Sequence, residues 1–150
     1  MDEHRLFSLD EANATIPHLS AAFERLERLR EKITEAYRQM TAGGLRVEDE
    51  DEIHALDPSE LGPELRSVAA RFKQMVREVE RTVGAIHAMG CEIKDLRMGL
   101  VDFYSVIDGE PVYLCWQYGE DEVAFYHSLQ GGFAGRQPLP GRQSTGIVYN

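Results

Sequence analysis

The sequence predicts an α+β fold: a long antiparallel two-helix hairpin, then a small three-stranded antiparallel β-meander and an irregular C-terminal tail. Two long segments with apolar residues at three- and four-residue steps predict the helices. After Gly90 the apolar period changes from about 3.6 residues to 2, and β-branched and aromatic residues become frequent, which predicts strands. A chain of 150 residues is expected to form one domain, residues 1–150.

The first helix is expected over residues 8–42. Ser8 followed by Glu11 is the capping-box pattern at its start, and the pair Gly43–Gly44 ends it. One apolar stripe runs along it: Leu9, Ala12, Ile16, Leu19, Phe23, Leu26, Ile33, Tyr37 and Met40.

The second helix is expected over residues 63–89. Pro63 suits its first turn, and Gly90 suits a left-handed cap after its last residue. Its apolar stripe is Leu65, Val68, Phe72, Met75, Val79, Val83 and Ile86. Two helices of similar length with near-heptad spacing predict antiparallel packing like that of a coiled coil.

The connection between the helices, residues 43–62, is expected to be a mobile acidic loop with a short helical turn around residues 53–56. Eight acids against one base between Arg46 and Glu64 give −7 of the formal net charge of −10. The remaining chain is therefore nearly balanced and has no concentrated basic face, so no nucleic-acid partner is expected.

The same connection partly matches a calcium-binding loop. Carboxylates fall at template positions 1, 3, 9 and 12: Asp49, Asp51, Asp57 and Glu60. The match fails because Ile53 occupies a ligand position and His54 replaces the glycine that the turn requires. A solvated acidic run is the favoured interpretation.

The sheet is expected within residues 91–129, as strands over 99–107, 111–118 and 123–129. Asp108–Gly109 between the first two strands is a strong signal for a two-residue hairpin. The tail, residues 130–150, is rich in Gly and Pro and is expected to be irregular.

Register decides which side chains of this sheet can meet. The Asp108–Gly109 turn pairs Phe103 with Leu114 and Asp102 with Cys115. A four-residue loop at 119–122 then pairs Leu114 with His127. This places His127 and Asp102 on opposite faces, with His127 on the core face beside Trp116. The alternative, a three-residue loop, places His127 opposite Tyr113 and on the face of Asp102.

Ligand, metal or acid–base candidates are Asp102, Glu120 and His127, which lie near strand ends or within strands. Arg136, between glycines, is a candidate anion-binding residue, but a strut to Asp102 or Glu120 is favoured. Structural roles are assigned to Trp116, Cys115, Gly90, Asp108 and Gly109. His87 and Cys91 lie four residues apart, but two ligands make no metal site, and packing roles are favoured.

The cellular setting follows from what the sequence lacks. No stretch is apolar enough to span a membrane, and the N-terminus has no apolar signal core. The two cysteines lack CxxC spacing, so a reduced, buried pair in the cytoplasm is expected. No cofactor is predicted, apart from a divalent metal ion as a weaker alternative, and no membrane partner.

Four separated motifs resemble a known family: FSLDEANATIP, CEIKDLRMGLVDF, VYLCWQYGEDEVAFYH and GGFAGRQPL. In order and content they are similar to the prokaryotic family called domain of unknown function 2203. The resemblance implies an intracellular bacterial protein and brings no activity with it. It places these residues at characteristic family positions: Asp95, Asp102, Cys115, Trp116, Glu120, His127 and Arg136. The family usually has a tryptophan at Tyr126 and an acid at Ser128, and these departures argue against a carboxylate-rich metal site after Phe125.

Two hypotheses of function follow, and the sequence establishes neither. The favoured one is a non-enzymatic interaction or assembly module, a homodimer formed through the helices, because Leu29, Ala36 and Val76 widen the apolar stripe beyond a two-helix seam. The alternative is a site on the sheet that binds a metal or small anion and could support hydrolysis. It would use Asp102, Glu120, His127 and Arg136.

Overall fold

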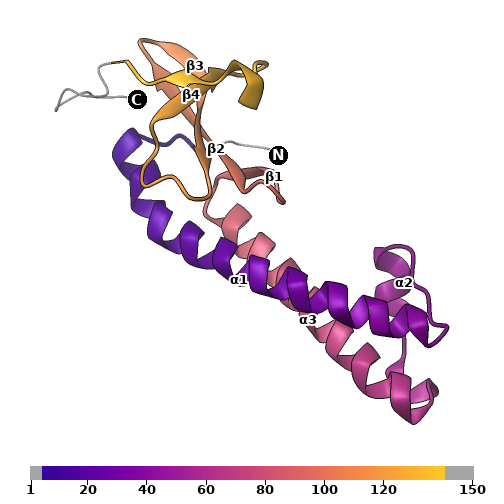
Figure 1. Ribbon diagram of the computed structural model, residues 1–150. Helices are drawn as coiled ribbons and strands as arrows, with labels where there is room; N and C mark the ends of the chain where they lie inside the picture. The colour runs from indigo at the N-terminus through magenta and orange to yellow at the C-terminus, as the bar shows by residue number, and fades with distance from the viewer. Residues whose placement is uncertain (1–4, 141–150) are drawn as a thin grey trace. The chain divides into compact units, whose positions relative to one another are not determined.

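A computed structural model describes residues 5–140 of the chain, which form two compact units. The sheet unit comprises the chain up to Phe23 and from Val83 onward, and the helical unit comprises Glu24–Thr82. Helix α1 (Leu9–Ala42) and helix α3 (Pro63–Ala88) each contribute to both units (Figure 1). The predicted α+β class is confirmed, and each helix begins and ends within one residue of the range expected for it.

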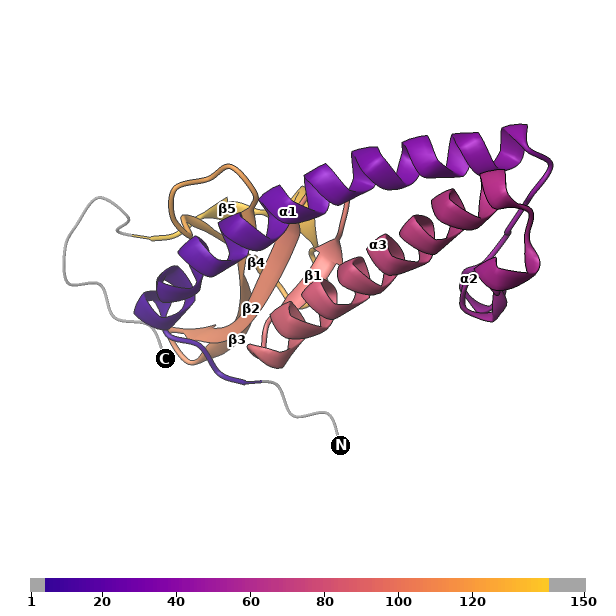
Figure 2. The same cartoon turned by 90° about the horizontal axis from the view of Figure 1, so that it is seen from below.

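In the helical unit, the later turns of α1 and the earlier turns of α3 run antiparallel and side by side (Figures 1 and 2). Their contact is an apolar cluster of buried residues: Ala36, Met40, Val47, Val68, Ala69 and Phe72. The rings of Tyr37 and Phe72 lie 6.1 Å apart, and Arg25 forms an ion pair with Glu78. The predicted hairpin seam is therefore present in this unit.

The acidic connection is more ordered than the predicted loop. It contains helix α2 (Glu50–Ala55) and a 3-10 turn, η1 (Pro58–Glu60). The Asp49 carboxylate accepts a hydrogen bond from the Glu52 amide at 2.9 Å and so caps α2. Lys73 Nζ donates to the carbonyl oxygens of His54 and Leu56, at 3.0 and 2.5 Å. Asp57 likewise caps η1, so two of the four carboxylates in the calcium-loop pattern serve as helix caps.

The sheet has five antiparallel strands in the order β1-β2-β3-β4-β5, so the prediction of three strands is wrong. The strands are β1 (Glu92–Asp95), β2 (Leu100–Ile107), β3 (Glu110–Gln117), β4 (Phe125–Ser128) and β5 (Gln137–Pro138). The two additional strands lie at the edges, where a four-residue segment with three charged residues and a Gln–Pro pair gave no strand signal. The tail also contains a 3-10 turn, η2 (Phe133–Gly135), and its last ten residues lie outside the described part.

The hairpin between β2 and β3 has the predicted register, with Phe103 opposite Leu114 and Asp102 opposite Cys115. Asp108 and Gly109 both have positive φ, 51° and 81°, as a two-residue turn of this type requires. The predicted register of β3 and β4 is wrong. His127 lies opposite Tyr113 and not Leu114, which moves it from the predicted core face to the face of Asp102.

The connection after β3 explains this difference. It runs from Tyr118 to Ala124, longer than the four-residue loop expected. The Val123 amide donates to Asn13 Oδ1 at 2.7 Å, so α1 holds the strand entry. A long-range bond of this kind leaves no local sequence signal.

The core face of the sheet packs on the start of α1. Trp116, Phe103, Leu114 and Val101 have no exposed surface. The rings of Phe23 and Trp116 lie 6.1 Å apart, and those of Phe7 and Phe103 5.0 Å apart with edge-to-face geometry. Within residues 5–140, no helix combines the length and apolar character that a membrane crossing needs.

Candidate metal centre

The face of the sheet opposite this core forms a pocket of about 300 Å³. Its floor consists of Asp102 from β2, Cys115 from β3 and His127 from β4, three residues on neighbouring strands. Each is at most 2% exposed. Asp102 and His127 were predicted as candidates for one site together with Glu120, but on opposite faces of the sheet, and Cys115 was assigned a structural role. The structure brings all three together.

The three side chains form a compact group of possible metal ligands. His127 Nε2 lies 2.9 Å from Asp102 Oδ2, and the Cys115 thiol lies near the Asp102 carboxylate and acts to lower its pKa. One ligand atom from each residue lies within 4.8 Å of the others. Metal–ligand bonds of about 2.0 to 2.3 Å place neighbouring donors roughly 3 to 4 Å apart, so the Nε2–Oδ2 distance of 2.9 Å would open slightly if the three donors shared one ion.

A backbone contact decides the orientation of His127. Nδ1 lies 2.7 Å from the Ser128 carbonyl oxygen, which can only accept, so Nδ1 carries a hydrogen. Neutral His127 therefore turns the lone pair of Nε2 toward Asp102. A lone pair and an ionised carboxylate repel at 2.9 Å unless a cation lies between them, and that cation is either a proton or a metal ion.

Burial governs the charge of the other two groups. It raises the pKa of Asp102 above its usual range, while His127, Lys94 and the Cys115 thiol act in the opposite direction. Burial, together with the negative charge of Asp102, raises the pKa of Cys115 to about 12. Cys115 is therefore a thiol at neutral pH and no ready nucleophile, but a bound metal ion would displace its proton.

The arrangement differs from a hydrolytic dyad. A general base in such a dyad uses one ring nitrogen to contact its carboxylate and presents the other to the nucleophile. In His127 both nitrogens are engaged, one with Ser128 and one with Asp102. No nitrogen of this ring is free to take a proton from a substrate, so acid–base hydrolysis by His127 has no support in this geometry.

The walls of the pocket combine one cation with apolar side chains. Lys94 Nζ lies 2.8 Å from a Glu92 carboxylate oxygen and 5.1 Å from the centre of the Tyr113 ring. Leu129 and Phe133 line the outer part. They are 39% and 40% exposed. Lys94 and Phe133 were missed as site residues because β1 and η2 were not predicted. Tyr113 was missed because the expected register paired His127 with Leu114 and not with Tyr113.

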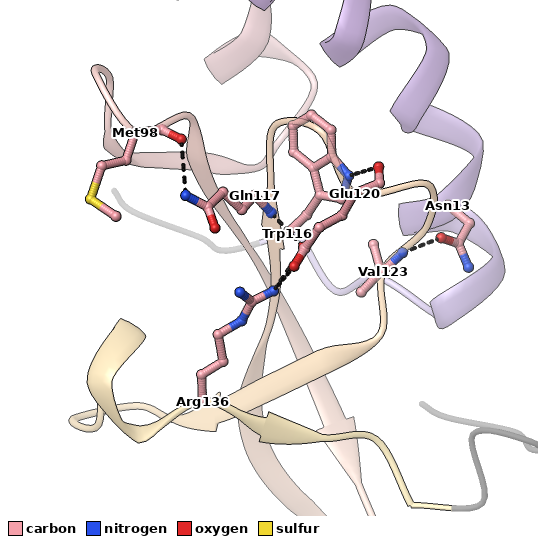
Figure 3. A network of polar contacts seen from close by, with 7 residues as sticks. All are labelled: Asn13, Met98, Trp116, Gln117, Glu120, Val123 and Arg136. Carbon is pink, nitrogen blue, oxygen red and sulfur yellow. Dashed lines mark hydrogen bonds and ion pairs between the residues drawn. The ribbon is translucent and has the colours of Figure 1, made fainter.

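Glu120 and Arg136 belong to a different polar network, next to the end of β3 where the β3–β4 connection begins (Figure 3). The Arg136 guanidinium donates to both Glu120 carboxylate oxygens at 2.7 Å. The Glu120 carboxylate also accepts from the Gln117 amide at 2.8 Å, and its carbonyl oxygen accepts from Trp116 Nε1 at 2.9 Å. Arg136 is thus a strut to Glu120, one of the two partners predicted for it.

The strut also supports one wall of the pocket. The Arg136 guanidinium lies 4.0 Å from the centre of the Phe125 ring and 5.0 Å from that of Phe133. Arg136 therefore ties η2, which begins at Phe133, to the strand that carries His127. With its charge paired to Glu120, Arg136 has the contacts of a structural residue.

Other candidate ligands are less well placed. His87 Nε2 accepts the Ile93 amide at 3.4 Å, and Cys91 is buried with a pKa raised to about 11. Glu50, His54 and Glu80 form a cluster in the helical unit, where Nε2 of His54 lies 2.9 Å from Glu80, but this cluster lies on the surface. Within residues 5–140, the buried group of possible ligands is the one on the pocket floor.

The chain belongs to the family described as uncharacterized conserved protein (DUF2203), whose model matches residues 5–139. No curated protein matches the chain, and no solved structure does. Tyr126 and Ser128, the two positions at which a departure from the family pattern was expected, lie opposite Leu114 and Val112. Their side chains therefore point away from the face of His127.

Proposed function

We propose that this DUF2203 protein binds one divalent transition-metal ion of the zinc type through Asp102, Cys115 and His127. The observation that carries the proposal is the fixed ring of His127. Its Nδ1 donates to a backbone carbonyl at 2.7 Å, and its Nε2 points at a buried carboxylate. Metal-binding histidines typically have this arrangement, with one nitrogen held by a carbonyl or carboxylate and the other on the metal.

The donor set favours a particular class of ion. Imidazole nitrogen and thiolate sulfur suit zinc and its neighbours in the transition series, whereas calcium and magnesium prefer shells of oxygen ligands. Three protein ligands leave a fourth tetrahedral position, which would face the pocket. Catalytic zinc sites keep this position open for water or substrate, whereas structural zinc sites fill it with a fourth protein ligand. The thiol also requires a reducing compartment, as the cytoplasm is.

The competing explanation is a buried Asp102–His127 ion pair held by a proton. Such pairs are inefficient at stabilising a fold, because the cost of removing two charges from water offsets most of their attraction. A thiol on the same carboxylate and a pocket above it would then be incidental. The metal site accounts for all three features together.

Cobalt(II) is the suitable probe, because a cysteine thiolate bound to it produces a charge-transfer absorption band. The metal-stripped chain is titrated with Co²⁺ and then with Zn²⁺ as competitor. We expect one ion per chain and a rise in the melting temperature, since ion at 1,000 times its Kd adds about 4 kcal/mol to stability. Cys115→Ser should abolish the charge-transfer band, and His127→Gln should weaken binding by about 10-fold or more.

Cys91→Ser is the matched control, because Cys91 is equally buried and lies outside the pocket. This variant should titrate like the unaltered chain. If the unaltered chain shows no cobalt band and no thermal shift with either ion, the pair is proton-held and the proposal fails.

Assembly through the helices remains a separate prediction with reduced support. The residues that motivated it, Leu29 and Ala36, are buried within the chain, and Val76 packs against the apolar cluster of the helical unit. The widened stripe is therefore already covered. Light scattering on a size-exclusion column tests the prediction directly: a monomer at high protein concentration would overturn it.

A further inference from the structure

We infer that the pocket accepts a small carboxylate with an apolar body, whose carboxylate takes the open metal position beside Lys94. The inference rests on the proposed metal site and goes further by assigning the class of ligand. It has three supports: the charges around the floor, the apolar walls, and the rigidity of one wall.

Lys94 supplies a positive charge with which an anion in the pocket can pair. A divalent ion bound by the Asp102 carboxylate and the Cys115 thiolate forms a centre without net charge. Lys94 is the cation among the residues that line the pocket. Its side chain is 44% exposed, and the hydrogen bond to Glu92 raises its pKa, so the ammonium group stays charged and can take a second partner. The Asp95 carboxylate, which also lines the pocket, is engaged by the Met98 amide at 2.9 Å.

The apolar side chains of the outer walls favour an anion that carries an apolar group. Leu129 and Phe133 contribute exposed apolar surface, and the Tyr113 ring contributes an aromatic wall between Lys94 and His127. Small-molecule sites commonly combine apolar walls with a few polar groups that orient the ligand. A volume of about 300 Å³ lies at the lower end for such sites, which are roughly 300 to 1,000 Å³. This size suits an aromatic ring or a short alkyl chain.

The wall that carries Phe133 is held in place before any ligand arrives. Its ring rests on Arg136, which is fixed to Glu120 by two hydrogen bonds of 2.7 Å. Gly132, beside it, has a φ of 63° and also lines the pocket. A side chain at this position would be strained, so the bend into η2 depends on glycine. A preformed wall lowers the ordering cost of binding.

The test uses the cobalt-loaded full chain and four probes: benzoate, hexanoate, acetate and benzylamine. Benzoate and hexanoate should change the cobalt spectrum and bind at least about 10-fold more tightly than acetate, which lacks the apolar body. Benzylamine keeps the ring but reverses the charge, and it should leave the spectrum unchanged. Binding constants come from calorimetry.

Two variants and a control connect the result to the structure. Lys94→Gln should weaken benzoate about 10-fold without altering cobalt affinity, and Phe133→Ala should weaken benzoate more than acetate. Lys32→Gln, an exposed lysine of the helical unit, should change neither.

The outcomes separate the two proposals. A normal cobalt band that no carboxylate alters, or equal binding of benzoate and benzylamine, overturns the ligand class and leaves the metal site standing. Loss of the cobalt band in the unaltered chain overturns the metal site, and this inference with it.

Discussion

His127 Nε2 lies 2.9 Å from Asp102 Oδ2, although the two residues are on strands β4 and β2 and Cys115 of β3 lies between them in the sheet. The contact is possible because β4 pairs with β3 one residue away from the predicted register. This register places a thiol, a carboxylate and an imidazole on one face of the sheet, at the floor of a pocket.

Replacing Asp102 and replacing His127 should lower the free energy of unfolding by different amounts. In Asp102→Asn the amide can donate to the Nε2 lone pair, so the loss should be below about 1.5 kcal/mol. In His127→Phe the carboxylate stays buried without its partner, and the loss at neutral pH should reach about 3 to 5 kcal/mol. Urea unfolding measures both. Equal losses would show that the contact does not depend on charge.

The pH dependence of His127→Phe has a definite sign. Burial raises the pKa of Asp102, and this variant lacks the histidine that opposes the shift. The protonated carboxyl is then the form the fold favours. The contribution of Asp102 to stability should be complete below its unfolded pKa of about 3.9 and should be lost as pH rises through the higher folded pKa. Urea midpoints at acidic and neutral pH test this, and a variant more stable at neutral pH contradicts it.

Trp116→Ala should lower the unfolding free energy by about 3 to 5 kcal/mol, because its fully buried side chain packs on Phe23. Circular dichroism follows the urea transition, since the variant lacks tryptophan. Leu96→Ala is the control: Leu96 is 44% exposed and should change stability by no more than about 0.5 kcal/mol. An unchanged midpoint for Trp116→Ala would overturn the assignment of the core face.

The Arg136–Glu120 ion pair should contribute to the stability of the fold and should not contribute to metal binding. Arg136→Ala and Glu120→Gln should each cost about 1 to 3 kcal/mol, and the double variant should cost less than their sum because both remove the same contact. Cobalt stoichiometry should stay at one ion per chain. A loss of cobalt with unchanged stability would instead make these residues part of the metal site.

The two thiols should be unreactive in the native chain. Burial raises the pKa of Cys91 from its ordinary value of 9.0 to about 11 and that of Cys115 to about 12. A disulfide reagent at pH 8 should find almost no free thiol until the chain is unfolded, and then two. Because both pKa values are raised, the stability linked to these thiols is complete below about pH 8.5 and is lost as pH rises through 11 to 12. Rapid labelling of either thiol in the folded chain contradicts this.

Local signals account for the parts of the fold that sequence reasoning predicted. The capping box is formed, with the Glu11 amide on Ser8 Oγ at 3.1 Å and the Ser8 amide on the Glu11 carboxylate at 2.9 Å. The Asp108–Gly109 turn sets the β2–β3 register in the same way. Both signals lie within a few residues of the structure that they specify.

The candidate site could be predicted only in part, because long-range contacts assemble it. The residue types at Asp102 and His127 identified them as candidates, but their meeting depends on the β3–β4 register. Edge strand β1, which carries Lys94, is short and polar, and forms through pairing with β2. No periodicity in the sequence reports such pairing, so the cation of the pocket was missed.

Asn13 should therefore matter more than its position on the first turns of a helix suggests. Its Oδ1 accepts the Val123 amide at 2.7 Å, and Val123 is 1% exposed. Asn13→Ala leaves that amide without its acceptor and should cost about 1 to 3 kcal/mol. Asn13→Asp keeps an acceptor oxygen and should retain most of the stability. Hydrogen exchange at Val123 should accelerate in Asn13→Ala and stay slow in Asn13→Asp. Since this bond holds the entry to β4, cobalt binding should weaken in the same order, whereas unchanged exchange in both variants would show that the β3–β4 register is set elsewhere.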